Sequence, residues 1–340
     1  MNVRFRTVVE DIRFKLAKLP QFARITLPDM PHSGPQSRAN TLRVCLVDMN
    51  NGVANQATRC FRRIVEAFGQ RVREKNPHVE LVFKHVQPRN LGELPSHDDD
   101  LVLSSGGPGS PHDGFDDAWC VGFRKFIDHV VESNRSGAPA AGPKLLAVCH
   151  SFQLSVLHLK VAQMKKRASL KFGLMPAYMT DHGESADFLS PFGYRLFCWE
   201  HRNWEALELD EKRLAALGGR VLAKETHQTH DRSKYKGDAI LSLRFAPGID
   251  GTQFHPEADK PGVMNWIERP EHKVAVQDAY GEVLYDRMVK SLANPDRLAK
   301  TFALLIPGWL TYRFNEIAPA RDWKPLDPPS QDMASFDVAV

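Results

Sequence analysis

A cysteine at the end of an apolar run is the residue of this sequence best placed to act as a nucleophile. Cys149 follows residues 145–148 (LLAV) and precedes residues 150–153 (HSFQ), which suit the first turn of a helix. A sharp turn between strand and helix strains the backbone and exposes the side chain, while the helix N-terminus favours a thiolate. A lone cysteine after an apolar run is usually an inert core residue, so a catalytic role depends on the groups that join it.

Two further segments supply such groups. Residues 253–257 (QFHPE) place His255 two positions before Glu257, which gives a base and a carboxylate that can orient it. Residues 104–111 (SSGGPGSP) follow an apolar run, and their glycines allow close approach of backbone amides to an oxyanion. This loop lacks the G-K-[ST] ending of a phosphate-binding P-loop. The three segments together predict nucleophilic catalysis by a thiol.

Strands and helices alternate in the half of the chain that carries Cys149. Short apolar runs predict strands, and apolar residues at helical spacing predict helices between them. This alternation is typical of a parallel sheet, whose ligand sites lie at the carboxyl ends of the strands. The predicted strands are Leu42–Asp48, Val79–Val86, Leu101–Ser104 and Leu145–Cys149, and the predicted helices are Gln56–Lys75 and Ala118–Glu132.

The pattern changes after Gly173, where shorter, strand-rich segments follow one another, and again beyond Pro261, where it becomes helical. Residues 165–167 (KKR) are interpreted as a solvated helix end, and Phe302–Ile306 as packing of the C-terminal helices on the main domain. The predicted strands are Met175–Thr180, Arg195–Glu200, Arg220–Glu225, Ala239–Phe245 and Gly251–His255; the predicted helices are Val276–Leu292 and Asp296–Ile306, the latter stopped by Pro307-Gly308.

Composition narrows the class of protein. The chain has 340 residues, 42% hydrophobic and 25% charged, which is ordinary for a globular protein. A net charge of +4 without a long basic stripe argues against nucleic acid as a partner. The cysteines, five and scattered, argue against a disulfide framework and favour the reducing cytoplasm. The sequence shows neither an apolar run long enough to span a membrane nor the features of a signal peptide.

The first 40 residues form a segment of their own. Apolar residues at helical spacing and interspersed Arg and Lys predict an amphipathic basic helix over residues 1–19, followed by a linker that ends near Asn40. Such a helix packs on the body of the protein or on a partner subunit, or it associates with a membrane surface without spanning it.

Four segments in register resemble the class I glutamine amidotransferase family. They are the glycine loop, the Cys149 turn, the QFHPE segment and residues 198–201 (CWEH), which resemble the family's substrate-side strand and histidine turn. The opening strand at residues 45–48 (CLVD) also fits. The resemblance covers residues 41–258 and implies a flavodoxin-like fold: an open, mostly parallel twisted sheet flanked by helices. Residues 1–40 and 259–340 are then N-terminal and C-terminal helical extensions.

The resemblance also implies roles for individual residues. Cys149 would attack the side-chain amide of glutamine, His255 would transfer the proton, and Glu257 would orient the imidazole while a γ-glutamyl thioester forms. The backbone amides of Gly107 and His150 would form the oxyanion hole. The residues expected to bind substrate are Gln153, Gly109, His201 and Arg202. No metal or other cofactor is implied.

Two pairs of residues each have a second interpretation. His201 and Arg202 have a structural role as an alternative. His227 and His230 have a spacing that could ligate a metal, although acidic or thiol ligands are not evident nearby.

The turn departs from the family pattern on both sides of the nucleophile. Ala147 and Ser151 stand where the family usually has glycine, so a methyl and a hydroxymethyl group must fit into a close backbone contact. His150, directly after Cys149, is also unexpected. These positions bear on whether the pocket takes glutamine.

The resemblance implies an amidotransferase subunit that hydrolyses glutamine and supplies ammonia to a synthetase or ligase on another chain. One alternative is a stand-alone cysteine hydrolase of γ-glutamyl compounds; homoserine acyltransferases also resemble this fold and its Cys-His-Glu chemistry, but no acyl-CoA site is evident. Another alternative is a regulatory or binding homologue in which the altered turn has abolished turnover.

Overall fold

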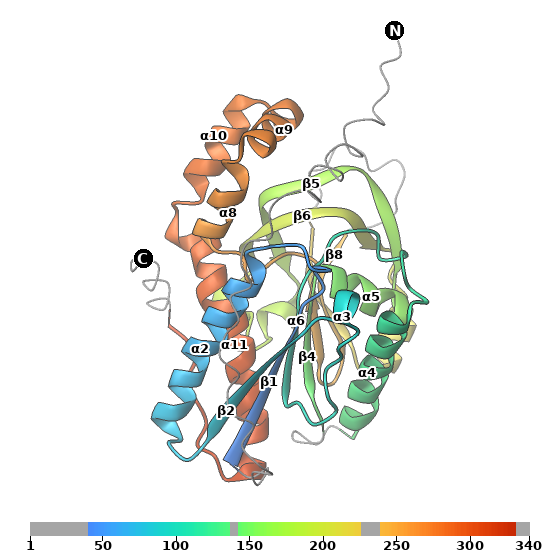
Figure 1. Cartoon of the computed structure of the whole chain (residues 1–340), viewed down its shortest axis with the longest axis vertical. Helices are drawn as coiled ribbons and strands as arrows, with labels where there is room; N and C mark the ends of the chain where they lie inside the picture. The colour runs from blue at the N-terminus through green and yellow to red at the C-terminus, as the bar shows by residue number, and fades with distance from the viewer. Residues whose placement is uncertain (1–39, 137–141, 226–238, 331–340) are drawn as a thin grey trace. The chain divides into compact units, whose positions relative to one another are not determined.

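The computed structural model describes residues 40–136, 142–225 and 239–330 (Figure 1). The helix predicted over residues 1–19 and the histidines at 227 and 230 lie outside these ranges. The first elements are β1 Thr41–Val47, α2 Ala57–Lys75, β2 Glu80–Val86, α3 Pro88–Leu91, β3 Leu101–Ser104, α4 Ala118–Asn134, β4 Lys144–Val148 and α5 His150–Leu159. They are followed by β5 Gln163–Met179, α6 Asp181–Glu184, η2 Ser190–Phe192, β6 Arg195–Leu207, α7 Glu211–Ala216, β7 Arg220–Lys224, β8 Ile240–Ala246 and β9 Ile249–Thr252. The last are α8 Lys260–Ile267, α9 Pro270–Tyr280, α10 Glu282–Ser291, η3 Pro295–Ala299, α11 Lys300–Ile317 and η4 Ala318–Arg321.

A parallel sheet carries the predicted site. Its strands lie in the order β2-β1-β3-β4-β9, and each pairs with its neighbours in parallel. This is the strand order of flavodoxin-like sheets. The mixed α/β class and the parallel half predicted from the sequence are therefore confirmed.

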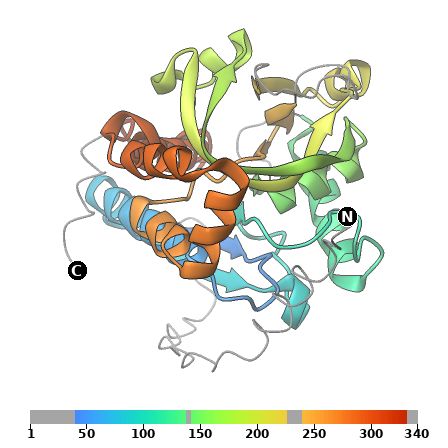
Figure 2. The ribbon, with the colours of Figure 1, turned by 90° about the horizontal axis from the view of Figure 1, so that it is seen from above.

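Helices cover both faces of this sheet (Figure 1). Because side chains alternate along a strand, Leu42, Val44 and Leu46 of β1 join the core beneath α2 and α11. Cys45 and Val47 join the opposite core, beneath α4 and α5. Seen along their axes, α2 and α11 lie side by side (Figure 2). The sheet is thus buried on both faces, as its continuous apolar strands predict.

The expectation of an open sheet is wrong at the antiparallel end. Strand β8 pairs with both β6 and β7, and β5 pairs with both β6 and β7, so these strands close a small ring. The β5–β6 pair is long, and its register shifts between Lys166 and Lys171, which bends the ribbon so that it can curl back. The strands predicted from the sequence are shorter than β5 and β6, so they did not reveal that this pair is long enough to curl back.

Residues 165–167 were interpreted as a solvated helix end, and this interpretation is wrong. They lie in β5, and the Arg167 side chain is only 13% exposed. Its guanidinium pairs with Glu205 on the neighbouring strand β6. The carboxylates that hold this basic stretch come from a segment distant in the sequence.

Helix α11 does not stop at Pro307, as the sequence suggested; it continues to Ile317. Proline removes a backbone donor and ordinarily costs a helix about 3 kcal/mol. Here the helix is buried over most of its length against β1 and α2, and Trp309 is fully enclosed. Thr311 also donates to the Pro307 carbonyl at 2.8 Å. Tertiary packing thus outweighs the local preference, and the predicted packing of residues 302–306 is confirmed.

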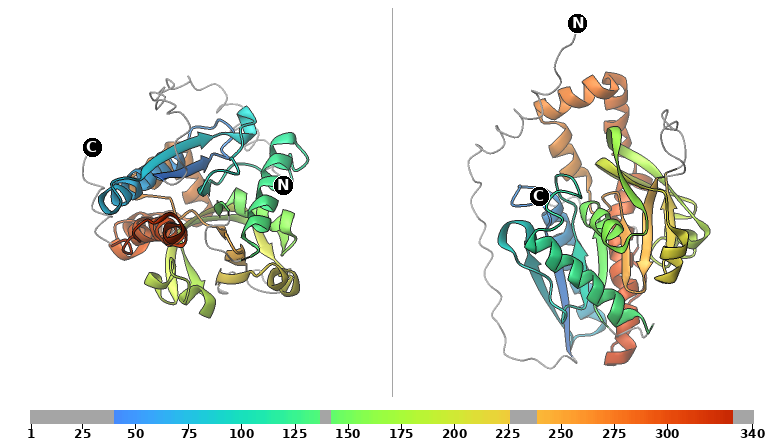
Figure 3. Two further views of the ribbon diagram at one scale, coloured as in Figure 1. Left: turned by 90° about the horizontal axis from the view of Figure 1, so that it is seen from below. Right: turned by 90° about the vertical axis from the view of Figure 1, so that its right-hand side faces the viewer.

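Helices α8–α10 lie beside the β5–β6 pair and share a third apolar cluster with it (Figure 3). The single helix predicted over Val276–Leu292 is instead two helices, because Gly281 adopts φ 81° between α9 and α10. In the part of the chain that the structure describes, no helix is long and apolar enough to cross a membrane.

Candidate active site

Cys149 lies between β4 and α5 with φ 50° and ψ −98°. An L-residue rarely adopts a positive φ, and such strain persists only where the surroundings fix it. Its amide donates to the Thr252 carbonyl at 2.7 Å, and its carbonyl accepts from Gln153 of α5 at 3.0 Å. The side chain is 6% exposed. The predicted sharp turn from strand to helix is present.

Small side chains make room for α5 behind this turn. One row of small residues crosses β3, β4 and β9, where Ser104, Ala147 and Gly251 are neighbours in register. A Cβ on Gly251 would lie 3.0 Å from the Phe152 ring of α5. The methyl group of Ala147 therefore stands in a row of small residues, where it is accommodated.

The hydroxyl of Ser151 turns the second departure from glycine into a set of contacts. Ser151 is fully buried; its Oγ donates to the Ser105 carbonyl at 2.7 Å and lies 2.6 Å from Ser104 Oγ. Ser105 Oγ in turn accepts from the Met49 amide at 2.9 Å and donates to the Gly106 carbonyl at 2.9 Å. These bonds tie the nucleophile turn to the end of β3 and to the glycine loop.

His255 and Glu257 join Cys149 as predicted. His255 Nδ1 lies 2.8 Å from Glu257 Oε1, and the imidazole interacts electrostatically with Cys149. The His255 amide donates to the Trp199 carbonyl of β6 at 2.9 Å, so the ring is fixed from its backbone. Glu257 is 2% exposed and its Oε2 has no hydrogen-bond partner among the described residues.

The charges around the imidazole set its protonation. Burial by itself lowers the pKa of His255, but the interactions of the imidazole with Cys149 and Glu257 outweigh burial and raise the pKa well above its usual value. A protonated imidazole is therefore favoured at neutral pH. It stands ready to give a proton to a leaving group bound at the sulfur.

The glycine loop packs so tightly that side chains are excluded. A Cβ on Gly106 would lie 2.7 Å from His255 Cε1 and 3.1 Å from Cys149 Cβ, which shows how closely the three residues approach. A Cβ on Gly107 would lie 2.2 Å from the Met49 carbonyl oxygen. Gly107, predicted for the oxyanion hole, is thus held on the loop beside the nucleophile.

Arg89 pins the outer part of this loop and was not singled out in the sequence. Its Nη1 donates to the Met49 carbonyl at 3.0 Å and to the Pro108 carbonyl at 2.8 Å. Gly109 has φ 99°, and a Cβ there would come within 3.7 Å of Arg89 Nη2. Gly109 therefore belongs to the loop's backbone turn, and nothing about its environment marks a substrate contact.

His150 contributes a neutral ring to the interior. It is 1% exposed, and neither ring nitrogen has a hydrogen-bond partner among the described residues. Burial, with a smaller contribution from the positive charge of Arg89, lowers its pKa to about 3. Gln153, predicted to bind substrate, lies one helical turn after Cys149 and is also buried.

The two residues predicted from the CWEH segment have different environments. His201 is exposed and lies edge-on to Phe172, with ring centroids 5.7 Å apart. Arg202 is buried and paired with Glu200 at 2.6 Å and with Glu225 at 2.7 Å. Its guanidinium is engaged by these carboxylates, which favours the structural role that was the alternative for Arg202.

Gln253 is a neighbour of the nucleophile that sequence reasoning treated only as part of a motif. Its side chain is fully buried, and Nε2 lies 3.9 Å from Cys149 Sγ, within reach of a weak hydrogen bond to sulfur. Its Oε1 has no partner among the described residues. Gln253 stands two residues before His255 in the QFHPE segment, and this position is the signal that could have identified it.

Comparison with known proteins identifies the fold. No protein-family model and no curated protein matches the sequence. The crystal structure of SMU.1228c is similar at a TM-score of 0.55 and 16% identity, over 80% of this chain and 99% of that one. A glutamine amidotransferase from Thermotoga maritima is similar at a TM-score of 0.51 and 12% identity, over 80% of this chain and 97% of that one.

The class of fold is thereby defined: a mixed α/β sheet with a strained cysteine at the carboxyl edge of its parallel strands. The chain has the fold of a glutamine amidotransferase, as the four motifs in its sequence predicted. At these identities the likeness establishes the fold alone.

Proposed function

We propose that this chain is a cysteine-dependent glutaminase that supplies ammonia to a synthetase or ligase on another chain. The observation that carries the proposal is the placement of Cys149, at a positive φ, beside an imidazole that Glu257 orients. The glutamine amidotransferase fold supports the same substrate. The proposed glutaminase domain spans residues 41–258, and the proposed location is the cytoplasm.

In the proposed reaction, the Cys149 sulfur attacks the amide carbon of glutamine. The backbone amides of Gly107 and His150 stabilise the resulting oxyanion; removal of one such donor typically costs about 3 kcal/mol of transition-state stabilisation. His255, whose pKa is raised, gives its proton to the departing ammonia and leaves a γ-glutamyl thioester. It then takes a proton from the water that releases glutamate.

Glu257 and Gln153 serve this chemistry in different ways. Glu257 accepts from His255 Nδ1, which leaves Nε2 for proton transfer on the side of the sulfur. Gln153, one helical turn after Cys149, is proposed to help seat the glutamine, and His201 is proposed to line the substrate pocket. Arg202 is proposed to hold strand β6 in place through its ion pair with Glu200. The same strand carries Trp199, whose carbonyl accepts from the His255 amide.

The test is release of glutamate from glutamine by the purified full chain, with Cys149→Ala and with Cys120→Ala as a matched control. Cys120 is a buried thiol outside the site, and burial raises its pKa to about 11. We expect glutamate release and alkylation by a glutamine-analogue diazoketone to depend on Cys149 and not on Cys120. Glutamate release unchanged in Cys149→Ala, or a Cys149 that is neither active nor alkylated, would reject the proposal.

The supply of ammonia to another chain is a separate part of the proposal. A stand-alone hydrolase would instead turn over γ-glutamyl amines rapidly without a partner. Faster turnover of a γ-glutamyl amine than of glutamine by the isolated chain would therefore favour the hydrolase.

A further inference from the structure

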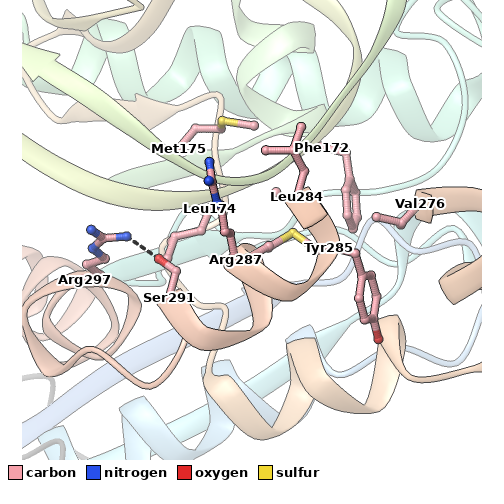
Figure 4. A pocket seen from close by; sticks show the side chains of 11 residues that line it. Phe172, Leu174, Met175, Val276, Leu284, Tyr285, Arg287, Ser291 and Arg297 are labelled. Carbon is pink, nitrogen blue, oxygen red and sulfur yellow. Dashed lines mark hydrogen bonds between the residues drawn. The ribbon is translucent and has the colours of Figure 1, made fainter. Parts of the chain in front are cut away.

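A cavity of about 250 Å³ lies between strand β5 and helices α9 and α10, next to the start of α11 (Figure 4). None of the residues that line it is among those assigned to the glutaminase chemistry. Residues 172–175 of β5 form one wall, and α10 with Arg297 of η3 forms most of the other.

The two ends of this cavity differ in character. At one end the rings of Phe172 and Tyr285 and the side chain of Val276 make an apolar wall (Figure 4). The Tyr285 hydroxyl donates to the Ile267 carbonyl at 3.4 Å, so the residue offers the cavity its ring. At the other end lie Arg287 and Arg297 (Figure 4). The lining is therefore polarised along its length.

The cationic end has no anion of its own. Arg287 is exposed and has neither a hydrogen bond nor an ion pair with any residue that the structure describes. Arg297 donates to Ser291 Oγ and lies 4.7 Å from the centroid of the Phe197 ring, but it faces no carboxylate in the described ranges. Two guanidinium groups at the end of an apolar slot suit a planar anion such as a carboxylate.

The backbone has an unusual conformation at both walls of the cavity. Arg297 has φ −114° and ψ −113°, which is outside the helical range, so the chain kinks at this residue just before α11. On the other wall Gly173 has φ 116°, and a Cβ there would lie 3.2 Å from Met288 Sδ, so glycine sets the distance between β5 and α10.

The length of the slot follows from element geometry. Phe172 and Met175 are three residues apart on a strand, which corresponds to about 10 Å. Tyr285 and Ser291 are six residues apart on a helix, which corresponds to about 9 Å. The two walls therefore have similar lengths, and the cavity suits a ligand about 10 Å long that is apolar at one end and anionic at the other.

We propose that this cavity binds a small amphipathic carboxylate, an alkyl or aryl acid whose carboxylate pairs with Arg287 and Arg297 and whose tail lies between Phe172 and Tyr285. The site does not depend on the proposed glutaminase, and its occupant is not the glutamine that Cys149 would attack.

Octanoate is the probe, titrated into the full chain by calorimetry, with octylammonium as the probe of opposite charge. Phe172 lies 5.0 Å from the Trp199 ring and 5.1 Å from the Trp266 ring, so a change in tryptophan fluorescence gives a second readout. We expect saturable octanoate binding that octylammonium does not reproduce. Equal binding of the two probes, or no binding of octanoate, would overturn the assignment.

A charge-deletion pair tests the cationic end. Arg287→Ala should weaken octanoate about tenfold or more, the usual effect of losing a charge-assisted contact, and Arg287→Lys should recover part of it. Lys290→Ala, which removes an exposed charge from the same helix outside the cavity, should leave the affinity unchanged. Affinity unchanged in Arg287→Ala, or lowered equally in Lys290→Ala, would contradict the proposal. Binding should persist in Cys149→Ala, so failure here is distinguishable from failure of the glutaminase.

Discussion

Replacing Ser151 with alanine should destabilise the protein although it removes a single oxygen atom. That oxygen is buried and bonds the Ser105 carbonyl and Ser104 Oγ, and Ser104 Oγ has no other hydrogen-bond partner among the described residues. A net hydrogen bond contributes about 0.5–1.5 kcal/mol, and a buried hydroxyl left without a partner costs about 1–3 kcal/mol. We therefore expect Ser151→Ala to lower the free energy of unfolding by about 2–3 kcal/mol.

The matched control is Ser155→Ala, one turn further along α5. Ser155 is equally buried, but among the described residues its hydroxyl bonds only the Ser151 carbonyl, within its own helix, at 2.8 Å. Since alanine also has the higher helix propensity, this change should cost less than about 1 kcal/mol.

Equilibrium unfolding in urea, followed by tryptophan fluorescence, measures both variants. The double variant Ser104→Ala/Ser151→Ala should be less destabilised than the sum of its singles, because the orphaned hydroxyl is removed with its partner. Equal effects of Ser151→Ala and Ser155→Ala, or a loss below about 0.5 kcal/mol in Ser151→Ala, would refute the proposed role of the hydroxyl network.

Three further changes test other parts of the structure. Because its pKa is raised, His255 should stabilise the fold fully below pH of about 6.5 and lose this contribution as pH rises through its folded-state pKa. Glu257→Gln lowers that pKa, so unfolding measured against pH should show a smaller decline above neutrality; an unchanged profile would argue against the pair. Gly106→Ala would place a Cβ 2.7 Å from His255 Cε1, so cysteine alkylation and glutaminase activity should fall at least about tenfold while the fold survives by circular dichroism. Asp250→Asn weakens a buried ion pair with Arg313 and should lower the free energy of unfolding by about 3–5 kcal/mol in urea titrations, whereas a loss under about 1 kcal/mol would show that the pair is dispensable.

The proximity of Cys149, His255 and Glu257 was predictable because these residues stand in short local patterns. Cys149 closes an apolar run, and His255 and Glu257 share one five-residue segment, so sequence alone could name all three. Their meeting follows from parallel pairing, since β4 and β9 are neighbours whose carboxyl ends lie at one edge.

Long-range partners could not be read in the same way. The role of Ser151 depends on hydroxyl and carbonyl groups on β3, and that of Arg89 on carbonyls of two different loops. The ring at the antiparallel end depends on pairing of β7 with β5 as well as β8, which no local pattern encodes. Pro307 was interpreted by its helix propensity, whereas burial of α11 decides its conformation.

The position of α11 has a consequence for synthesis of the protein. The last residue of the proposed chemistry is Glu257, yet Trp309 of α11 belongs to the core beneath β1 and donates to the buried Asp250 carboxylate at 2.8 Å. A nascent chain that has emerged only as far as the QFHPE segment has one face of its sheet covered by α2 but not by α11. Asp250 then has Arg244 as a partner, but neither Trp309 nor Arg313. The domain is therefore expected to complete its folding only after residue 317 has left the ribosome, and until then its apolar face is a target for chaperones.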